Sequence, residues 1–286
     1  LLQRAGHDLQ FLLRRDYQAI TAQGLKVTSP RGDFHLAEVA GFQTPEAIGV
    51  VDLVLVGLKA YANQSLVDLV APLVGEQTLL LTLQNGLGNE ELLAEAFGGE
   101  RVVGGVAFLC CNRGEPGTVH HLDQGAVRLA EYQGGLSDRV QQLAAAFTEA
   151  SIPCEACPDL RKIRWEKLVW NIPFNGLCAL TGQATDQLLA CPETRQLVGE
   201  MMSEVIAAAN RQGLTEPIEV ETFVRRMIVA TEGMGAYRPS MMIDRLERRS
   251  LELEAIYGIP LERAHLAEAP MTRVAMLHAL LKVTEQ

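Results

Sequence analysis

The sequence has no Gly-x-Gly-x-x-Gly segment, the loop with which most doubly wound domains hold the phosphates of a dinucleotide. It also has no apolar run of the roughly 18 residues that a membrane-spanning helix needs. Basic residues are outnumbered, with 25 Lys and Arg against 35 Asp and Glu, for a formal net charge of −10. A broad nucleic-acid surface needs clustered basic residues, so none is expected, whereas one small phosphate ligand is compatible with this charge.

Cysteine is scarce as well, with six residues that lack the regular spacing of a disulfide framework. Cys154 and Cys157 form a CxxC pair, which can bind zinc or carry redox chemistry, but the second pair of a zinc site is missing. His120 and His121 are neighbours, which point to opposite faces when they lie on a strand. We therefore expect reduced thiols, structural histidines and no metal site, as is typical of a cytoplasmic enzyme.

The chain begins with Leu1 rather than Met, and residues 1–8 have the pattern of a last helical turn stopped by Gly6. Residues 9–14 then have the pattern of a strand. Because a domain seldom begins in mid-helix, we expect a strand, a turn and most of a helix before Leu1. In a dinucleotide-binding fold, that unit would carry the glycine loop.

The chain of 286 residues is long enough for two domains, at roughly 100–200 residues each. Residues 1–157 alternate short apolar runs with helical periodicity, which predicts a mainly parallel sheet with helices between its strands. From Pro158 onward the strand-like runs vanish and helical periodicity takes over. The sequence therefore predicts an α/β protein with an N-terminal dinucleotide-binding domain (1–157) and a C-terminal all-helical domain (158–286).

Two basic positions lie where a cofactor would be expected. Arg14 and Arg15 end the strand predicted over 9–14, which would be the second strand of a dinucleotide-binding domain if one strand precedes Leu1. The end of that second strand meets the adenosine ribose, where an arginine pairs with the 2′-phosphate of NADP and an acidic residue would favour NAD. Lys59 follows a buried strand over 52–58, at the edge of a parallel sheet where ligands bind. Solvated surface side chains are the alternative for both positions.

The most informative segment is a predicted helix over 160–180 that carries Lys167, Asn171 and Asn175 along one face. The rest of that helix is largely apolar, and Pro173 bends it. Surface stripes are usually richer in Glu, Lys and Arg, so a cleft wall is favoured over a solvent-facing stripe. In such a cleft, a lysine ammonium can stabilise the oxyanion formed when a 2-keto acid is reduced and can supply its proton.

The chain resembles ketopantoate reductase in a series of elements that follow one another in the same order. These elements are Leu58–Ala60, Gln84–Gly88, Pro116–Val119, Trp165–Asn175, Pro239–Asp244 and Leu251–Glu254. The resemblance implies a Rossmann-type domain followed by a helical domain. It also implies NADPH-dependent reduction of 2-dehydropantoate (ketopantoate) to pantoate, a step towards pantothenate and coenzyme A.

The same resemblance implies roles for individual residues, with Lys167 as the general acid. The substrate contacts it implies are Asn85, Asn171, Asn175, Ser240 and Glu252. The cofactor contacts it implies are Arg14, Lys59, Asn85, Glu252 and, through its backbone, Cys110.

Other functions stay open at this point. Tyr257 and Thr185 stand where asparagine is common in that family, so a reductase of the same fold acting on another 2-oxoacid is the first alternative. A non-catalytic NADP-binding sensor is the second. The expected partner is a small 2-oxoacid rather than nucleic acid or membrane, and the helical domain could form a homodimer.

Overall fold

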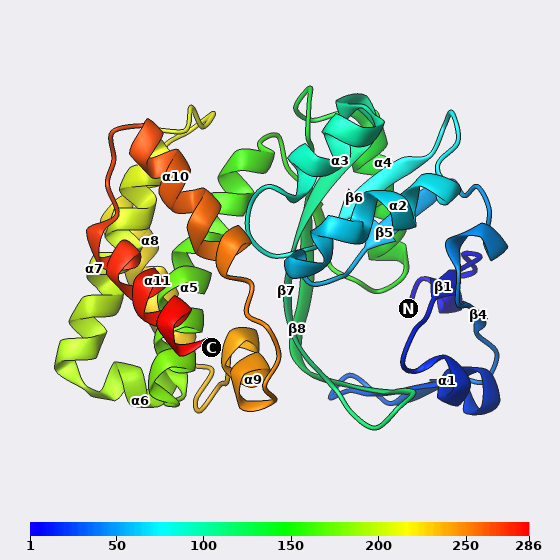
Figure 1. Cartoon of the computed structure of the whole chain (residues 1–286), viewed down its shortest axis with the longest axis horizontal. Coiled ribbons are helices and arrows are strands. Elements are labelled where there is room, and N and C mark those ends of the chain that lie inside the picture. The colour runs from blue at the N-terminus through cyan, green and yellow to red at the C-terminus, as the bar shows by residue number, and fades with distance from the viewer. Residues whose placement is uncertain (286) are drawn as a thin grey trace. The chain divides into compact units, whose positions relative to one another are not determined.

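The computed structural model describes residues 1–285, which form two compact units (Figure 1). The first unit comprises Leu1–Gly57, Gln64–Leu83 and Glu90–Pro158, and the second comprises Leu58–Asn63, Gln84–Asn89 and the chain from Asp159 onward. The first is built on a sheet and the second is helical, which confirms the predicted α/β class. The assignment of the two parts to cofactor and substrate stays a prediction.

The sheet of the first unit has seven strands in the order β3-β2-β8-β7-β6-β5, with β9 beside β8. The strands are β2 (Leu25–Thr28), β3 (Phe34–Leu36), β5 (Leu53–Val56), β6 (Leu79–Thr82), β7 (Val102–Arg113), β8 (Thr118–Glu131) and β9 (Cys154–Ala156). β5, β6 and β7 run parallel, whereas β7 and β8 form a long antiparallel hairpin. A separate two-stranded parallel sheet holds β1 (Gln10–Leu12) and β4 (Ala40–Phe42).

β8 is one strand, although the apolar runs 119–122 and 126–132 look like two strands in the sequence. Gln124 and Gly125 separate the two apolar runs, and both have a positive φ, at 62° and 116°. The pairing of β7 with β8 shifts register nearby, between Phe108 and Leu109 and again between Cys110 and Cys111. Such bulges add residues to one strand without ending it, so an interrupted pattern does not mark a turn here.

Helices cover both faces of this sheet. They are α2 (Leu66–Val70), α3 (Asn89–Phe97) and α4 (Asp138–Glu149), whereas α1 (Tyr17–Gln23) contacts β4 of the two-stranded sheet. Successive strand residues point to opposite faces, so Leu80 packs in a core with residues of α2 and α3, whereas Leu81 packs in another with residues of α4. The predicted helical turn at the start is a short 3-10 helix, Gln3–Ala5, which ends at Gly6 in the left-handed region.

The second unit surrounds α5 (Leu160–Thr181), which contacts α6, α7, α9 and α11. The other helices are α6 (Thr185–Ala190), α7 (Pro192–Asn210), α8 (Val220–Glu232), α9 (Ser240–Leu246), a π-helical turn over Glu254–Gly258, α10 (Ile259–Leu266) and α11 (Thr272–Thr284). α5 begins where the Asp159 carboxylate accepts from the Lys162 backbone N–H at 2.9 Å. It ends at Gly182, whose φ of 71° stops the helix. Within residues 1–285, no helix is both long and apolar enough to cross a membrane.

All six cysteines are free thiols, and the described residues include no group of three or more His, Cys, Asp or Glu placed to hold a metal ion. Burial, with a smaller contribution from Cys157, raises the pKa of Cys154 to about 11. Redox-active CxxC thiols instead have lowered pKa values. Cys154 therefore lacks the lowered thiol pKa of a redox-active CxxC.

We expect iodoacetamide to alkylate Cys154 more slowly than the exposed Cys191 at pH 8, because only the thiolate attacks and the pKa of Cys154 is raised. The rate at Cys154 should rise about tenfold per pH unit between pH 8 and pH 10, while thiolate is the minor form. Peptide mass spectrometry of samples quenched over time measures both rates. A rate at Cys154 that levels off below pH 9 would show a redox-type thiol instead.

Candidate active site

α5 carries the predicted stripe as one continuous helix, with Pro173 inside it. Asn171 and Asn175 are 3% and 1% exposed, so a solvent-facing stripe is excluded for these two residues, and Lys167 is half-buried. The amide nitrogen of Asn171 and the amide oxygen of Asn175 are buried without a hydrogen-bond partner. A buried polar atom left without a partner costs about 1–3 kcal/mol. The face beside Lys167 therefore holds one donor and one acceptor that a ligand could satisfy.

A second polar group surrounds Lys59, in the segment Leu58–Asn63 that packs with the helical unit. The Lys59 ammonium donates to Asp244 Oδ2 at 2.6 Å and to Glu252 Oε2 at 3.3 Å. The other Glu252 oxygen accepts from the Ala60 backbone N–H at 2.9 Å. Burial acts to lower the pKa of Lys59, but the Glu252 and Asp244 carboxylates outweigh it and raise this pKa above its usual value. Lys59 and Glu252, predicted from distant parts of the sequence, are thus in contact.

Asp244 has no role in the sequence analysis beyond its place in a family motif. It is 2% exposed and lies on α9 next to the buried methionines Met241 and Met242. A carboxylate in an apolar run is a signal that could have found it, because a buried charge needs a partner. Its partner, Lys59, lies 185 positions away in the sequence, so the pair itself could not be read from spacing.

The loop Gln84–Asn89 follows β6 and belongs with the helical unit. Arg164 on α5 donates to the Gln84 carbonyl at 2.6 Å, and the Leu87 N–H donates to the Ala255 carbonyl at 2.9 Å. Gly86 has a φ of 83°, and a Cβ there would lie 2.3 Å from the Ala255 carbonyl oxygen, so only glycine fits. These contacts hold Asn85, which is half-buried, between α5 and the π-helical turn.

Ser240 is the first residue of α9, is half-buried, and makes no side-chain hydrogen bond within residues 1–285. The loop before it is anchored by Thr185, whose hydroxyl donates to the Gly235 carbonyl at 3.0 Å. Tyr257 is fully buried and donates to the Ile172 carbonyl on α5 at 2.8 Å. Thr185 and Tyr257 thus donate their hydroxyl hydrogens to the protein's own backbone.

Arg14 and Cys110 lie in the first unit. Arg14 is exposed just beyond β1 and has no side-chain partner within the described chain, whereas Arg15 pairs with Asp16 at 3.3 Å. Cys110 is buried in the part of β7 that extends past β6, at a register shift of the hairpin. Cys110 is paired with Asp123 in that hairpin.

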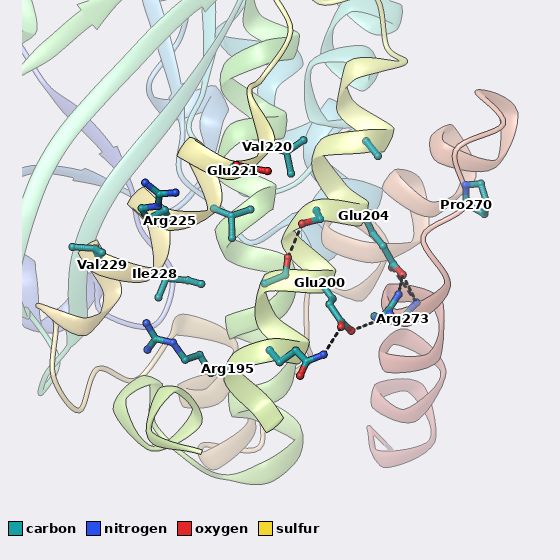
Figure 2. A pocket seen from close by; sticks show the side chains of 15 residues that line it. Arg195, Glu200, Glu204, Val220, Glu221, Arg225, Ile228, Val229, Pro270 and Arg273 are labelled. Atoms are coloured by element: carbon teal, nitrogen blue, oxygen red, sulfur yellow. Dashed lines mark hydrogen bonds and ion pairs between the residues drawn. The ribbon is translucent and has the colours of Figure 1, made fainter. Parts of the chain in front are cut away.

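The second unit also has an open groove of about 820 Å³ between α7, α8 and the start of α11 (Figure 2). Several of its charged side chains are in ion pairs: Arg273 lies 2.7 Å from Glu200 and 3.0 Å from Glu204. Arg195 pairs with Glu232 at 2.6 Å. None of the predicted site residues lines this groove, so it is not the candidate active site.

Comparison with known proteins identifies the family. The family model described as ketopantoate reductase PanE/ApbA matches residues 1–134, and its C-terminal counterpart matches residues 159–285. The chain belongs to the ketopantoate reductase family. A 2-dehydropantoate 2-reductase from Nostoc sp. is 41% identical over 98% of this chain and 89% of its own length.

Solved structures of the ketopantoate reductase family agree with this. The 2-dehydropantoate 2-reductase from Geobacter metallireducens GS-15 is 54% identical, with a TM-score of 0.97 over 99% of this chain and 94% of its own. The enzyme of the same name from Methylococcus capsulatus is 30% identical, with a TM-score of 0.89 over 99% of this chain and 91% of its own. As a ketopantoate reductase family member, the chain is an oxidoreductase with a dinucleotide-binding fold.

We expect Asn175→Leu to stabilise the ligand-free protein while weakening substrate binding, because it removes a buried oxygen that has no partner. The free energy of unfolding should rise by about 1 kcal/mol, and KM for the 2-oxoacid should rise about tenfold. Urea denaturation and steady-state kinetics measure the two effects.

Asn210→Leu is the matched control, because the Asn210 side chain bonds both the Ile218 carbonyl at 2.9 Å and the Ile218 N–H at 2.7 Å. It should destabilise the protein and leave KM unchanged. Loss of stability in Asn175→Leu comparable to that in Asn210→Leu would rule out an unsatisfied ligand contact at Asn175.

Proposed function

We propose that this protein reduces 2-dehydropantoate to pantoate with NADPH. The observation that carries the proposal is the stripe on α5, where Lys167 shares a face with two buried asparagine amides that lack partners. Such a face offers a proton donor beside uncharged groups that orient a ligand. Membership of the ketopantoate reductase family supports the same reaction.

The two asparagines suit a substrate with both kinds of hydrogen-bonding group. The Asn171 amide nitrogen lacks an acceptor, which a carboxylate or keto oxygen can supply, and the Asn175 oxygen lacks a donor. 2-Dehydropantoate carries a hydroxyl that can donate to Asn175, whereas 2-oxoacids with hydrocarbon side chains have no such donor. Ser240, with no side-chain partner in the described chain, can donate to the substrate carboxylate.

Proton transfer falls to Lys167. When bound, NADPH supplies the hydride that reduces the C2 carbonyl of the substrate. Lys167 then stabilises the negative charge that develops on the C2 oxygen and donates a proton from its Nζ to that oxygen. Asn85, held by the Gln84–Asn89 loop, is the amide we assign to both substrate and cofactor.

The cofactor contacts we infer are Arg14, Lys59, Glu252 and the backbone of Cys110. Arg14 fits the 2′-phosphate of NADP, because it is exposed at a strand end and no carboxylate in the described residues pairs with it. That contact makes NADPH the proposed reductant rather than NADH.

A reductase of another 2-oxoacid is the second candidate, favoured by Thr185 and Tyr257 in place of family asparagines. A D-mandelate dehydrogenase with NADH and anilino(oxo)acetate, 20% identical to this chain, shares its fold. Comparing kcat/KM for 2-dehydropantoate and for branched 2-oxoacids without a hydroxyl separates the candidates. An equal or higher value for one of the latter would refute the specific substrate.

Two further inferences concern the state of the protein. A ketopantoate reductase from Staphylococcus aureus with this fold is described as dimeric, and we propose a homodimer here too. The absence of a membrane-crossing helix in residues 1–285 is compatible with the proposed cytoplasmic location.

We expect Lys167→Ala to lower kcat by about 10²–10⁴-fold, the usual contribution of a positioned general acid, while the thermal midpoint changes little. Lys162→Ala is the control on the same helix, because Lys162 pairs at 3.1 Å with the exposed Glu216 and should leave kcat unchanged. Full activity of folded Lys167→Ala would favour the sensor hypothesis or a different proton donor.

We expect Arg14→Ala to raise KM for NADPH about 10–100-fold, because charge-assisted hydrogen bonds to the 2′-phosphate are lost. KM for NADH, which has no such phosphate, should stay the same. Arg15→Ala, which removes a side chain already paired with Asp16, is the control. Equal effects of Arg14→Ala on NADPH and NADH would refute the phosphate contact.

A further inference from the structure

Asp244 uses both of its carboxylate oxygens, although only 3% of its side chain is exposed. Oδ2 accepts from the Lys59 ammonium at 2.6 Å, and Oδ1 accepts from Arg249 Nε at 2.9 Å. The Arg249 backbone N–H also donates to the Asp244 carbonyl at 2.7 Å. The Asp244 carboxylate is therefore fixed by Lys59 on one oxygen and by Arg249 on the other. Because Arg249 restrains it, Asp244 also restrains the position of the Lys59 ammonium.

Lys59 is held by two buried carboxylates rather than one. Its contact with Asp244, at 2.6 Å, is shorter than that with Glu252, at 3.3 Å. An ammonium has three N–H donors, and these two contacts use two of them. The Lys59 side chain is 33% exposed, and no third partner of its ammonium lies within residues 1–285, so one N–H remains for a ligand.

The charges around Lys59 also limit what that ligand can be. Lys59 and Arg249 face Asp244 and Glu252, and Arg249 also pairs with the exposed Glu247. The group therefore has no net positive charge to attract a phosphate. A neutral acceptor, such as a hydroxyl or a carboxamide oxygen, matches a single N–H from a compensated ammonium.

We propose that Asp244 is a positioning residue of the active site. It fixes the Lys59 ammonium so that the third N–H points at a neutral oxygen of the bound dinucleotide, in the hydroxyl or carboxamide class. This rests on the proposed function, in which Lys59 contacts the cofactor. Glu252 alone cannot replace Asp244, because its other oxygen is bonded to the Ala60 N–H and its contact with Lys59 is the longer one.

The test is a double-mutant cycle between Asp244→Asn and Lys59→Met, read out as the dissociation constant of NADPH in a fluorescence titration without substrate. Each single variant should weaken NADPH binding about tenfold, the effect of one lost hydrogen bond. The double variant should bind NADPH no more weakly than Lys59→Met, because Asp244 acts through Lys59. Multiplied effects, or unchanged binding in Asp244→Asn, would overturn the proposal.

The thermal midpoints of the same three variants give a second test. Lys59→Met leaves two buried carboxylates without their shared cation and should lower the thermal midpoint. Adding Asp244→Asn removes one of these charges and should recover part of that loss. If Lys59→Met does not fold, Arg249→Gln tests the same point, because loosening Asp244 should weaken NADPH binding in the same direction; unchanged binding there would overturn the proposal.

Glu247→Gln is the matched control, because Glu247 contacts Arg249 but has no contact with Lys59. It should bind NADPH like the unmodified protein. The ratio of NADPH dissociation constants between Lys59→Met and the unmodified protein should not change with ionic strength if the acceptor is neutral. A ratio that shrinks as salt is added would show a phosphate contact instead.

The proposed NADPH titration contains no 2-oxoacid, so its result does not depend on which substrate the enzyme reduces. A protein that binds NADPH but fails to reduce 2-dehydropantoate would refute the proposed reaction and leave the role of Asp244 testable.

Discussion

One ammonium shared by two buried carboxylates organises the candidate site. Lys59 contacts Asp244 and Glu252, which come from α9 and from the stretch before the π-helical turn. A buried carboxylate without a cation is costly, so each of the three residues requires the others. This mutual requirement explains why the segment after β5 packs with the helical unit instead of ending at the sheet. The candidate site therefore depends on the short segment Leu58–Asn63, which follows β5 and packs with the helical unit.

The segment Gln84–Asn89, which follows β6, is also bonded to the helical unit, but through hydrogen bonds made by its backbone instead of by a charged side chain. Gln84 and Leu87 are bonded through their backbones to Arg164 and Ala255, and Gly86 allows the close approach. Backbone contacts of this kind leave the Asn85 side chain uncommitted. Ligands of open α/β folds usually bind beyond the carboxyl ends of strands, and here those ends continue into segments that are fastened by specific bonds. Lys59 and Asn85, the ligand contacts proposed here, are thereby held in fixed positions, which favours catalysis.

On α5, in contrast, two buried side chains reduce the stability of the ligand-free protein. Its two buried asparagines keep polar atoms without partners, at a cost that a purely structural helix would avoid. Two neighbouring polar side chains are bonded: Tyr257 donates to the Ile172 carbonyl, and Trp170 donates to Thr231 at 2.9 Å. Trp165 Nε1, also on α5, is buried without a partner as well, so what distinguishes the two asparagines is that they share a helix face with Lys167.

The sequence alone predicted the α/β class, the change to helices after Pro158 and the single polar face of α5, because hydrophobic periodicity and helical spacing are local properties. It also predicted the glycine stop at Gly6. Only the tertiary structure decided that Lys59 contacts Glu252, that Asp244 joins them, and that Asn171 and Asn175 are buried with atoms unpaired. The reason is physical: Lys59 and Asp244 are 185 positions apart, and burial and charge pairing depend on which distant segments the fold brings into contact.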